Sequence, residues 1–98
     1  MTNWYTKEVE TLFEAILTLR NVDECRVFFE DVCTLKELRE ISQRLQVAQM
    51  LRSGTSYALI NAQTGVSTAT ISRVSRCLEY GPGGYDLVMS RMEKEAES

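Results

Sequence analysis

Residues 56–78 read SYALINAQTGVSTATISRVSRCL and predict two short helices joined at a glycine. Leu59 and Ile60 would face inward from the first helix, and Gly65 can adopt the positive φ that ends a helix without a steric penalty. Ser67 offers a hydroxyl that can cap the second helix. The buried stripe of this second helix would consist of Ile71, Val74 and Leu78. The pattern is typical of a helix-turn-helix, a unit with which small proteins enter a DNA major groove.

The outward face of the second helix carries short, polar or cationic side chains, which suit base edges and phosphates. They are Thr68, Ala69, Thr70, Ser72, Arg73 and Arg76. A face that is merely solvated usually shows Glu and Lys pairs at i,i+4, whereas this helix has no acid before Glu79. Helix pairs around a glycine also serve as scaffolding, and Asn61 stands where many reading units have a small alanine. The pattern favours DNA binding, with a scaffold role as the alternative.

Positive charge is concentrated around this unit, although the formal net charge of the chain is −3. Residues 1–33 hold three cations against seven acids, a local charge of −4, and residues 79–98 hold two cations against five acids, a charge of −3. Residues 34–78 hold six cations against two acids and therefore carry +4. Because the local field steers a protein toward phosphate more than the net charge does, this distribution fits a nucleic-acid partner. Ordinary scatter of charges is the alternative.

The 98 residues, 44% of them hydrophobic, predict one domain spanning residues 1–98. No apolar run approaches the ~20 residues needed to cross a bilayer. The polar N-terminus is not a secretory signal, so we expect a cytoplasmic protein without a membrane partner. Cys25, Cys33 and Cys77 are odd in number and lack CxxC spacing, which argues against a disulfide framework or a zinc site.

The composition also argues against an enzyme. The chain has no histidine, which removes the usual general base near neutral pH and all His-ligated metals. The segment Gly81-Pro82-Gly83-Gly84 follows no predicted strand and has no adjacent lysine, so it is not a phosphate-binding loop. We expect no catalytic residues, no cofactor and no metal.

The remaining sequence has helical periodicity as well. The apolar stripe of a first helix would comprise Val9, Leu12, Phe13, Ile16 and Leu17. Asp23 can cap a second helix that ends at about residue 32. Thr34 and Glu37 form a capping box that opens a long helix, which ends before Gly54. The inward residues of this long helix would be Leu38, Ile41, Leu45, Ala48 and Leu51.

These helices carry more apolar surface than a chain of this length can hide by itself. The surplus includes the aromatic residues Trp4, Tyr5, Phe13, Phe28, Phe29 and Tyr85. A homodimer would bury this surface and duplicate the reading helix about a two-fold axis, which matches a near-palindromic site in double-stranded DNA. A plain monomer core is the alternative. We therefore expect dimerisation helices in residues 1–54, the DNA-reading unit in 55–79 and a C-terminal dimer helix in 85–96.

The chain resembles the Trp repressor superfamily, in particular its YerC/YecD-type branch. The likeness rests on the Thr34 cap, Arg44, Gly54, the unit SYALINAQTGVSTATISR, and Pro82 before the last helix. It implies an all-α, six-helix fold in an intertwined homodimer. It also implies DNA contacts from Ser56, Asn61, Ser67, Thr68, Ala69, Thr70 and Ser72. From the charge pattern we add Arg52 and Arg76 as phosphate partners.

Members of the superfamily bind tryptophan between the long helix and the reading helix. By this resemblance Thr34, Arg44 and Arg73 match pocket positions. Val74 replaces a glycine that leaves room for the indole, and Cys77 replaces a serine near the ligand's amino group. Burying a valine is worth roughly 1.5 kcal/mol or more, so we expect Val74 to fill the slot and exclude tryptophan. The two arginines leave a different anionic effector open, although phosphates or helix ends are the preferred partners.

The sequence thus predicts a sequence-specific DNA-binding transcription regulator that acts as a homodimer without tryptophan as corepressor. The alternatives are a helical protein–protein interaction module and a sensor of another small anionic ligand.

Overall fold

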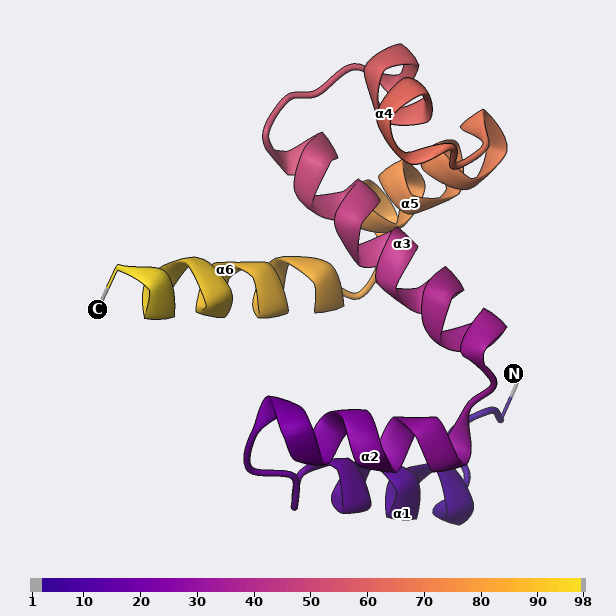
Figure 1. The fold of residues 1–98 in the computed structure, drawn as a ribbon, viewed down its shortest axis with the longest axis vertical. Helices are drawn as coiled ribbons and strands as arrows, with labels where there is room; N and C mark the ends of the chain where they lie inside the picture. Colours follow the sequence, from indigo (N-terminus) through magenta and orange to yellow (C-terminus); the bar gives the residue numbers. More distant parts are fainter. Residues whose placement is uncertain (1–2, 98) are drawn as a thin grey trace. The chain divides into compact units, whose positions relative to one another are not determined.

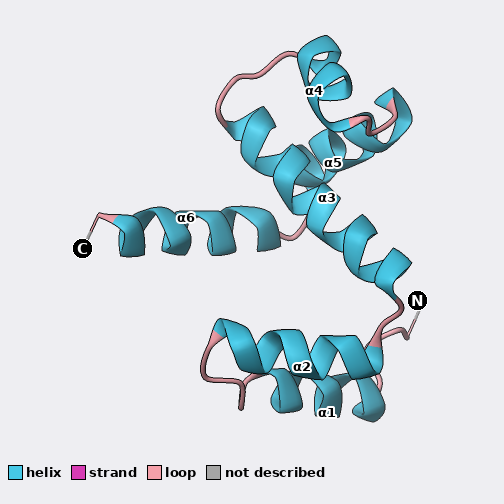
Figure 2. Cartoon of the chain, viewed as in Figure 1, coloured by secondary structure: helices cyan, strands magenta, loops and turns pink. Residues whose placement is uncertain are grey.

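The computed structural model describes residues 3–97, and within this range the chain forms six α-helices and no strand (Figure 1, Figure 2). The helices are α1 (Lys7–Ile16), α2 (Val22–Val32), α3 (Leu35–Arg52), α4 (Tyr57–Thr64), α5 (Thr68–Tyr80) and α6 (Gly84–Ala96). The predicted all-α, six-helix fold is confirmed. The chain divides into two compact units, the first ending at Leu38 and the second beginning at Arg39. No helix in residues 3–97 has the length and apolar character needed to cross a bilayer.

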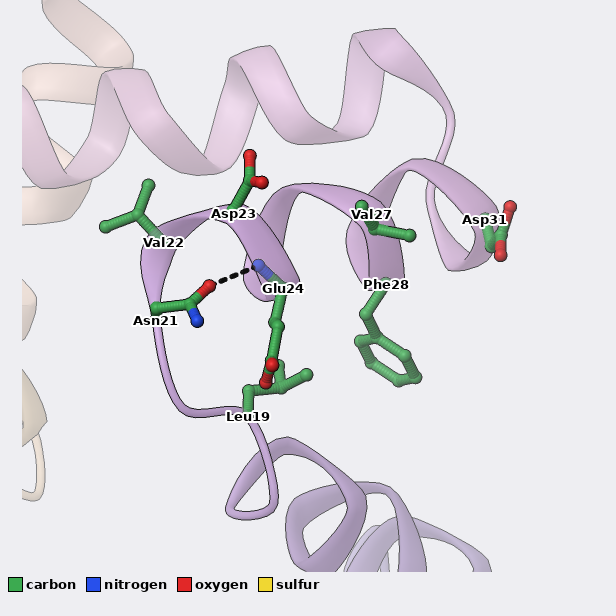
Figure 3. A pocket seen from close by; sticks show the side chains of 8 residues that line it. All are labelled: Leu19, Asn21, Val22, Asp23, Glu24, Val27, Phe28 and Asp31. Atoms are coloured by element: carbon green, nitrogen blue, oxygen red, sulfur yellow. Dashed lines mark hydrogen bonds between the residues drawn. The ribbon is translucent and has the colours of Figure 1, made fainter.

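Polar side chains set the starts of the helices in the first unit. Thr6 caps α1, since its Oγ1 accepts a hydrogen bond from the backbone N–H of Val9 at 3.3 Å. The cap of α2 is Asn21, whose Oδ1 accepts from the N–H of Glu24 at 2.8 Å (Figure 3). The prediction that Asp23 caps this helix is wrong. Asn21 already has the extended backbone of a cap, so Asp23 lies in the first turn, where its charge favours the helix dipole.

The predicted capping box at the start of α3 is confirmed. The N–H of Thr34 donates to Glu37 Oε1 at 2.9 Å, and the N–H of Glu37 donates to Thr34 Oγ1 at 3.1 Å. Each residue thus satisfies a backbone donor that the helix itself leaves unpaired. The bond from the Thr34 backbone, followed by the bond from its side chain, holds the pKa of Glu37 below its ordinary value.

The first unit keeps much apolar surface open. Neither α1 nor α2 contains a buried residue. Leu17 is 83% exposed and Val22 is 85% exposed, and Trp4 and Tyr5 are also exposed. The ring centroids of Trp4 and Tyr5 lie 5.4 Å apart in an edge-on arrangement, so the aromatic residues pack on each other at the surface.

The hydrophobic core lies in the second unit, where side chains from four helices and the α4–α5 turn meet. Its buried members are Val47, Ala48, Ile60, Val66, Ile71, Val74 and Met89. Leu45, Met50, Leu51, Leu78 and Tyr85 pack partly against it. Two residues predicted to face inward are instead about half exposed, Ile41 at 51% and Leu59 at 48%. The helix α4 has only eight residues and buries Ile60 alone, so its neighbour Leu59 points away from the core.

Candidate nucleic-acid interface

The unit α4–turn–α5 has the local geometry expected of a helix-turn-helix, with α4 and α5 in contact (Figure 1). Gly65 ends α4 with φ 74°, and its N–H donates to the carbonyl of Asn61 at 2.9 Å. Ser67 then caps α5, since its Oγ accepts from the N–H of Thr70 at 3.2 Å. Both predictions, the positive φ and the serine cap, are confirmed. Three residues therefore separate two capped helices that pack against each other.

Side-chain bonds lock this turn. Asn61 Nδ2 donates to the carbonyl of Val66 at 2.8 Å. Thr64 Oγ1 donates to the carbonyl of Ile60 at 2.7 Å and accepts from the N–H of Val66 at 3.1 Å. Asn61 stands where an alanine is common, and here its amide joins the middle of α4 to the turn that follows it. The bonds satisfy partly buried backbone groups, which are expensive to leave unpaired.

The outward face of α5 is open. Ile71 and Val74 lie in the core, and the exposed residues on the other side are Thr68, Ala69, Ser72, Arg73 and Arg76. Ala69, Ser72 and Arg76 follow one another at i, i+3 and i+7, so they form one stripe. No residue in 3–97 forms an ion pair with Arg73 or Arg76. The stripe thus offers small side chains at the start of the helix and a guanidinium two turns later.

Thr70 lies at the edge of this face. It is half-buried, and its Oγ1 accepts a hydrogen bond from the hydroxyl of Ser67 at 3.1 Å. The hydrogen of the Ser67 hydroxyl is therefore used within the chain. Ser56 differs, because its Oγ accepts from the N–H of Leu59 at 3.2 Å and no bond from residues 3–97 uses its own hydrogen.

Arg52, predicted as a phosphate partner, makes ion pairs within the second unit. Its guanidinium pairs with Asp86 at 2.9 Å and with Glu93 at 3.0 Å, and it donates to Ser90 Oγ at 3.1 Å. These three partners recur along one face of α6, at i, i+4 and i+7. Since its donors are engaged inside the chain, we leave Arg52 out of the DNA contacts.

The residues matched to a ligand pocket lie in four places: a pocket beside the turn, an apolar groove, the hydrophobic core and the capping box of α3. Arg44 and Arg73 line the same pocket of about 330 Å³, together with Thr70 and the turn residues 65–67. Glu40 also lines this pocket and lies 4.0 Å from the Arg44 guanidinium. Val74 is 2% exposed and belongs to the core, as a residue that fills a slot would.

The other two candidate pocket residues do not line this pocket. Cys77 is exposed and lines a second, apolar groove with Leu45, Tyr85 and Val88, and Arg44 lines this groove as well. Thr34 belongs to the first unit and forms the capping box with Glu37. Within the second unit, Arg44 therefore shares one pocket with Arg73 and the apolar groove with Cys77.

The sequence model of the Trp repressor protein matches residues 7–93. The chain belongs to the Trp repressor family. Among curated proteins it is 50% identical over 93 residues to the uncharacterised protein YerC of Bacillus subtilis (strain 168), a match that covers 94% of this chain and 89% of YerC. The predicted resemblance to a YerC-type member of the family is confirmed.

Solved structures agree with this assignment to the Trp repressor family. A TrpR-like protein from Eubacterium eligens ATCC 27750 is 54% identical and superposes with a TM-score of 0.87, over 91% of this chain and 92% of that protein. A candidate Trp repressor from Staphylococcus aureus is 49% identical with a TM-score of 0.86, over 90% of this chain and 88% of that protein.

A hollow elsewhere in this Trp repressor family member is less suited to nucleic acid than the α5 face. A hollow in the first unit is lined by Leu19, Val22, Val27 and Phe28, with the carboxylates of Asp23, Glu24 and Asp31 beside them (Figure 3). Carboxylates repel phosphate, so the hollow does not fit a DNA backbone. The α5 face remains the candidate interface.

Proposed function

We propose that this member of the Trp repressor family is a sequence-specific DNA-binding transcription regulator whose helix α5 enters the major groove. One observation carries the proposal. Helix α5 buries Ile71 and Val74, and its opposite face exposes a stripe of small and cationic side chains. A surface helix that only needs solubility favours Glu and Lys, whereas Thr and Ser are mediocre helix formers. Their presence on an exposed helix face fits contact with bases and phosphates.

We propose that the first turns of α5 contact base edges, whereas Arg76 and the starts of α4 and α5 contact phosphates. Thr68, Ala69, Thr70 and Ser72 would read bases. Arg76, which has no ion-pair partner in residues 3–97, would bind a phosphate. The capped starts of α4 and α5, at Ser56 and Ser67, would place backbone N–H groups near phosphates, with Asn61 beside them.

We further propose that the protein acts as a homodimer. The support is the apolar surface of the first unit, where α1 and α2 bury no residue within one chain. In the second unit, α6 also exposes the apolar side chains of Leu87, Val88 and Met92. A second copy would remove these side chains from water, since apolar burial is the dominant favourable term in association. Two copies of α5 would then face two half-sites of a near-palindromic operator.

Tryptophan is not part of the proposed mechanism, because Val74 occupies the core where a glycine would leave a slot. With the helix packed by its own side chain, the orientation of α5 on α3 does not depend on a ligand. A small anionic effector is the second candidate, favoured by the shared pocket of Arg44 and Arg73. A thermal-shift screen against amino acids and other small acids tests it, since a binder would raise the melting temperature.

The proposal is tested by introducing a carboxylate on the reading face. Binding of genomic DNA fragments is measured at low salt for the unchanged protein, for Ala69→Glu and for the control Ala96→Glu, which makes the same change at the exposed end of α6. We expect preferred fragments for the unchanged protein and the control, and loss of binding in Ala69→Glu. Uniform binding without preference, equal in all three proteins, would favour an interaction module for a protein partner.

A further inference from the structure

The start of α5 exposes methyl groups. DNA-reading helices that make bidentate base contacts carry amides or cationic groups there instead. Ala69 lies on the open stripe, and Thr68 lies beside it with both side chains exposed. The first cation on this helix is Arg73, and the first acid is Glu79. Residues 68–72 therefore contain no Asn or Gln for a bidentate adenine contact, no Arg or Lys for guanine and no acid for the cytosine amino group.

Hydroxyl groups near Ala69 are partly engaged within the chain. The Ser67 hydroxyl accepts from the N–H of Thr70 at 3.2 Å and donates to Thr70 Oγ1 at 3.1 Å. The exposed hydroxyl of Ser72 lies about one turn further along the stripe, so the exposed groups of the first turn of α5 are the methyl of Ala69 and the methyl and hydroxyl of Thr68. Because Ala69 has only a Cβ, the helix backbone must approach the bases closely for any contact to form.

From this arrangement we infer that α5 reads thymine through its 5-methyl group, with Ala69 as the specificity-determining residue and Thr68 as its neighbour. The inference rests on the proposed DNA-binding function. In the major groove the 5-methyl group distinguishes thymine from every other unmodified base, and alanine and threonine methyls are its apolar partners. Arg76, two turns further along the stripe, is then free to hold the backbone and fix the register.

The test uses the duplex that the protein itself selects from random sequence, with each thymine replaced in turn by deoxyuridine, which lacks only the methyl group. At one thymine per half-site we expect about a fourfold loss of affinity, equivalent to the ~0.8 kcal/mol of burying one methyl-sized group. In Ala69→Gly the same replacement should cause little loss. Ala69→Gly also weakens the helix, but this affects both duplexes equally, so the thymine-to-deoxyuridine ratio isolates the contact.

Three further variants sharpen the assignment. Ala96→Gly makes the same change at an exposed position of α6, outside the proposed reading face, and should keep the full deoxyuridine effect. Thr68→Val keeps a methyl group at its position and should keep any effect there, whereas Thr68→Ser should remove it. Deoxyuridine tolerated at every position, by a protein that still selects its sequence, would overturn the thymine inference and leave DNA binding intact. Failure to select any sequence would overturn the proposed function itself.

Discussion

Arg52 Nη1 lies 2.9 Å from Asp86 Oδ1, and this ion pair joins the last turn of α3 to the first turn of α6. The same guanidinium pairs with Glu93, two turns further along the same face of α6. Met89, between these two acids in sequence, is buried in the core that also holds Ile71 and Val74 of α5. Arg52 therefore fastens α6 to the helix on which the reading unit packs.

Arg52→Met is expected to destabilise the fold by about 1 kcal/mol, since the ion pairs are partly exposed. Denaturant unfolding measures this change. The salt dependence of DNA binding should remain that of the unchanged protein, because Arg52 makes no phosphate contact in this account. A salt slope lower by about one unit with unchanged stability would instead identify Arg52 as a phosphate partner.

Arg76→Ala is expected to weaken binding to all duplexes by a similar factor and to lower the salt slope by about one unit, as for the loss of one phosphate contact. Equilibrium titrations at several salt concentrations give the slope. Arg91→Ala removes an exposed cation from α6 and serves as the matched control, with no change in slope. Equal effects of the two variants would remove Arg76 from the interface.

Val74→Gly is expected to open the slot that the valine fills and to create tryptophan binding, which isothermal titration detects. The variant should lose roughly 2–4 kcal/mol of stability from the cavity and from glycine in a helix. Val74→Ala is the control with a smaller opening. The unchanged protein should give no heat with tryptophan, and micromolar binding by it would contradict the assigned role of Val74.

Gly65→Ala is expected to destabilise the protein by about 1–2 kcal/mol, because Gly65 has φ 74° and side chains are strained in that region. An added Cβ would meet nothing within 4 Å, so the change isolates backbone conformation. Gly84→Ala, also without neighbours and at the start of α6, should be neutral or mildly stabilising. Thermal unfolding compares the two, and an unchanged midpoint in Gly65→Ala would argue against the turn geometry.

The capping box of Thr34 and Glu37 predicts that the stability of the fold depends on pH. Bonds from Thr34 hold the pKa of Glu37 below its ordinary value of 4.5 in the folded state. A depressed carboxyl pKa contributes stability that is present above 4.5 and is lost as the pH falls through the lower, folded value. The advantage of the unchanged protein over Glu37→Gln should therefore be full near neutral pH and shrink in acid. An advantage that is independent of pH would show that the carboxylate is not the capping group.

Local patterns in the sequence predict the features that depend on neighbouring residues. A hydroxyl followed by helical periodicity is sufficient to place the caps at Thr34 and Ser67, and a glycine is sufficient to place the turn at Gly65. Asp23 and Asn21 can both cap, and only the extended backbone of Asn21 decides between them. Local capping chemistry therefore gives the position of a helix start to within two residues.

Features that depend on distant partners are beyond such patterns. Arg52 meets acids 34 and 41 residues away, so its cationic charge alone made it a plausible phosphate contact. Asn61 bonds a carbonyl five residues ahead, across a turn that helical periodicity does not describe. Leu59 belongs to a helix of eight residues, which is too short to show a clear apolar periodicity. Its exposure depends on which face of α4 packs against the core, and that face carries Ile60.

Selection of bound duplexes from a random library tests the central claim most directly, that paired copies of α5 read DNA. The claim predicts an enriched inverted repeat whose half-site centres lie about one helical turn apart, ~34–36 Å, or a multiple of it. An Ala69→Glu protein taken through the same rounds should enrich nothing. A library that stays random with the unchanged protein, or that yields a single half-site without its inverted partner, would contradict the claim.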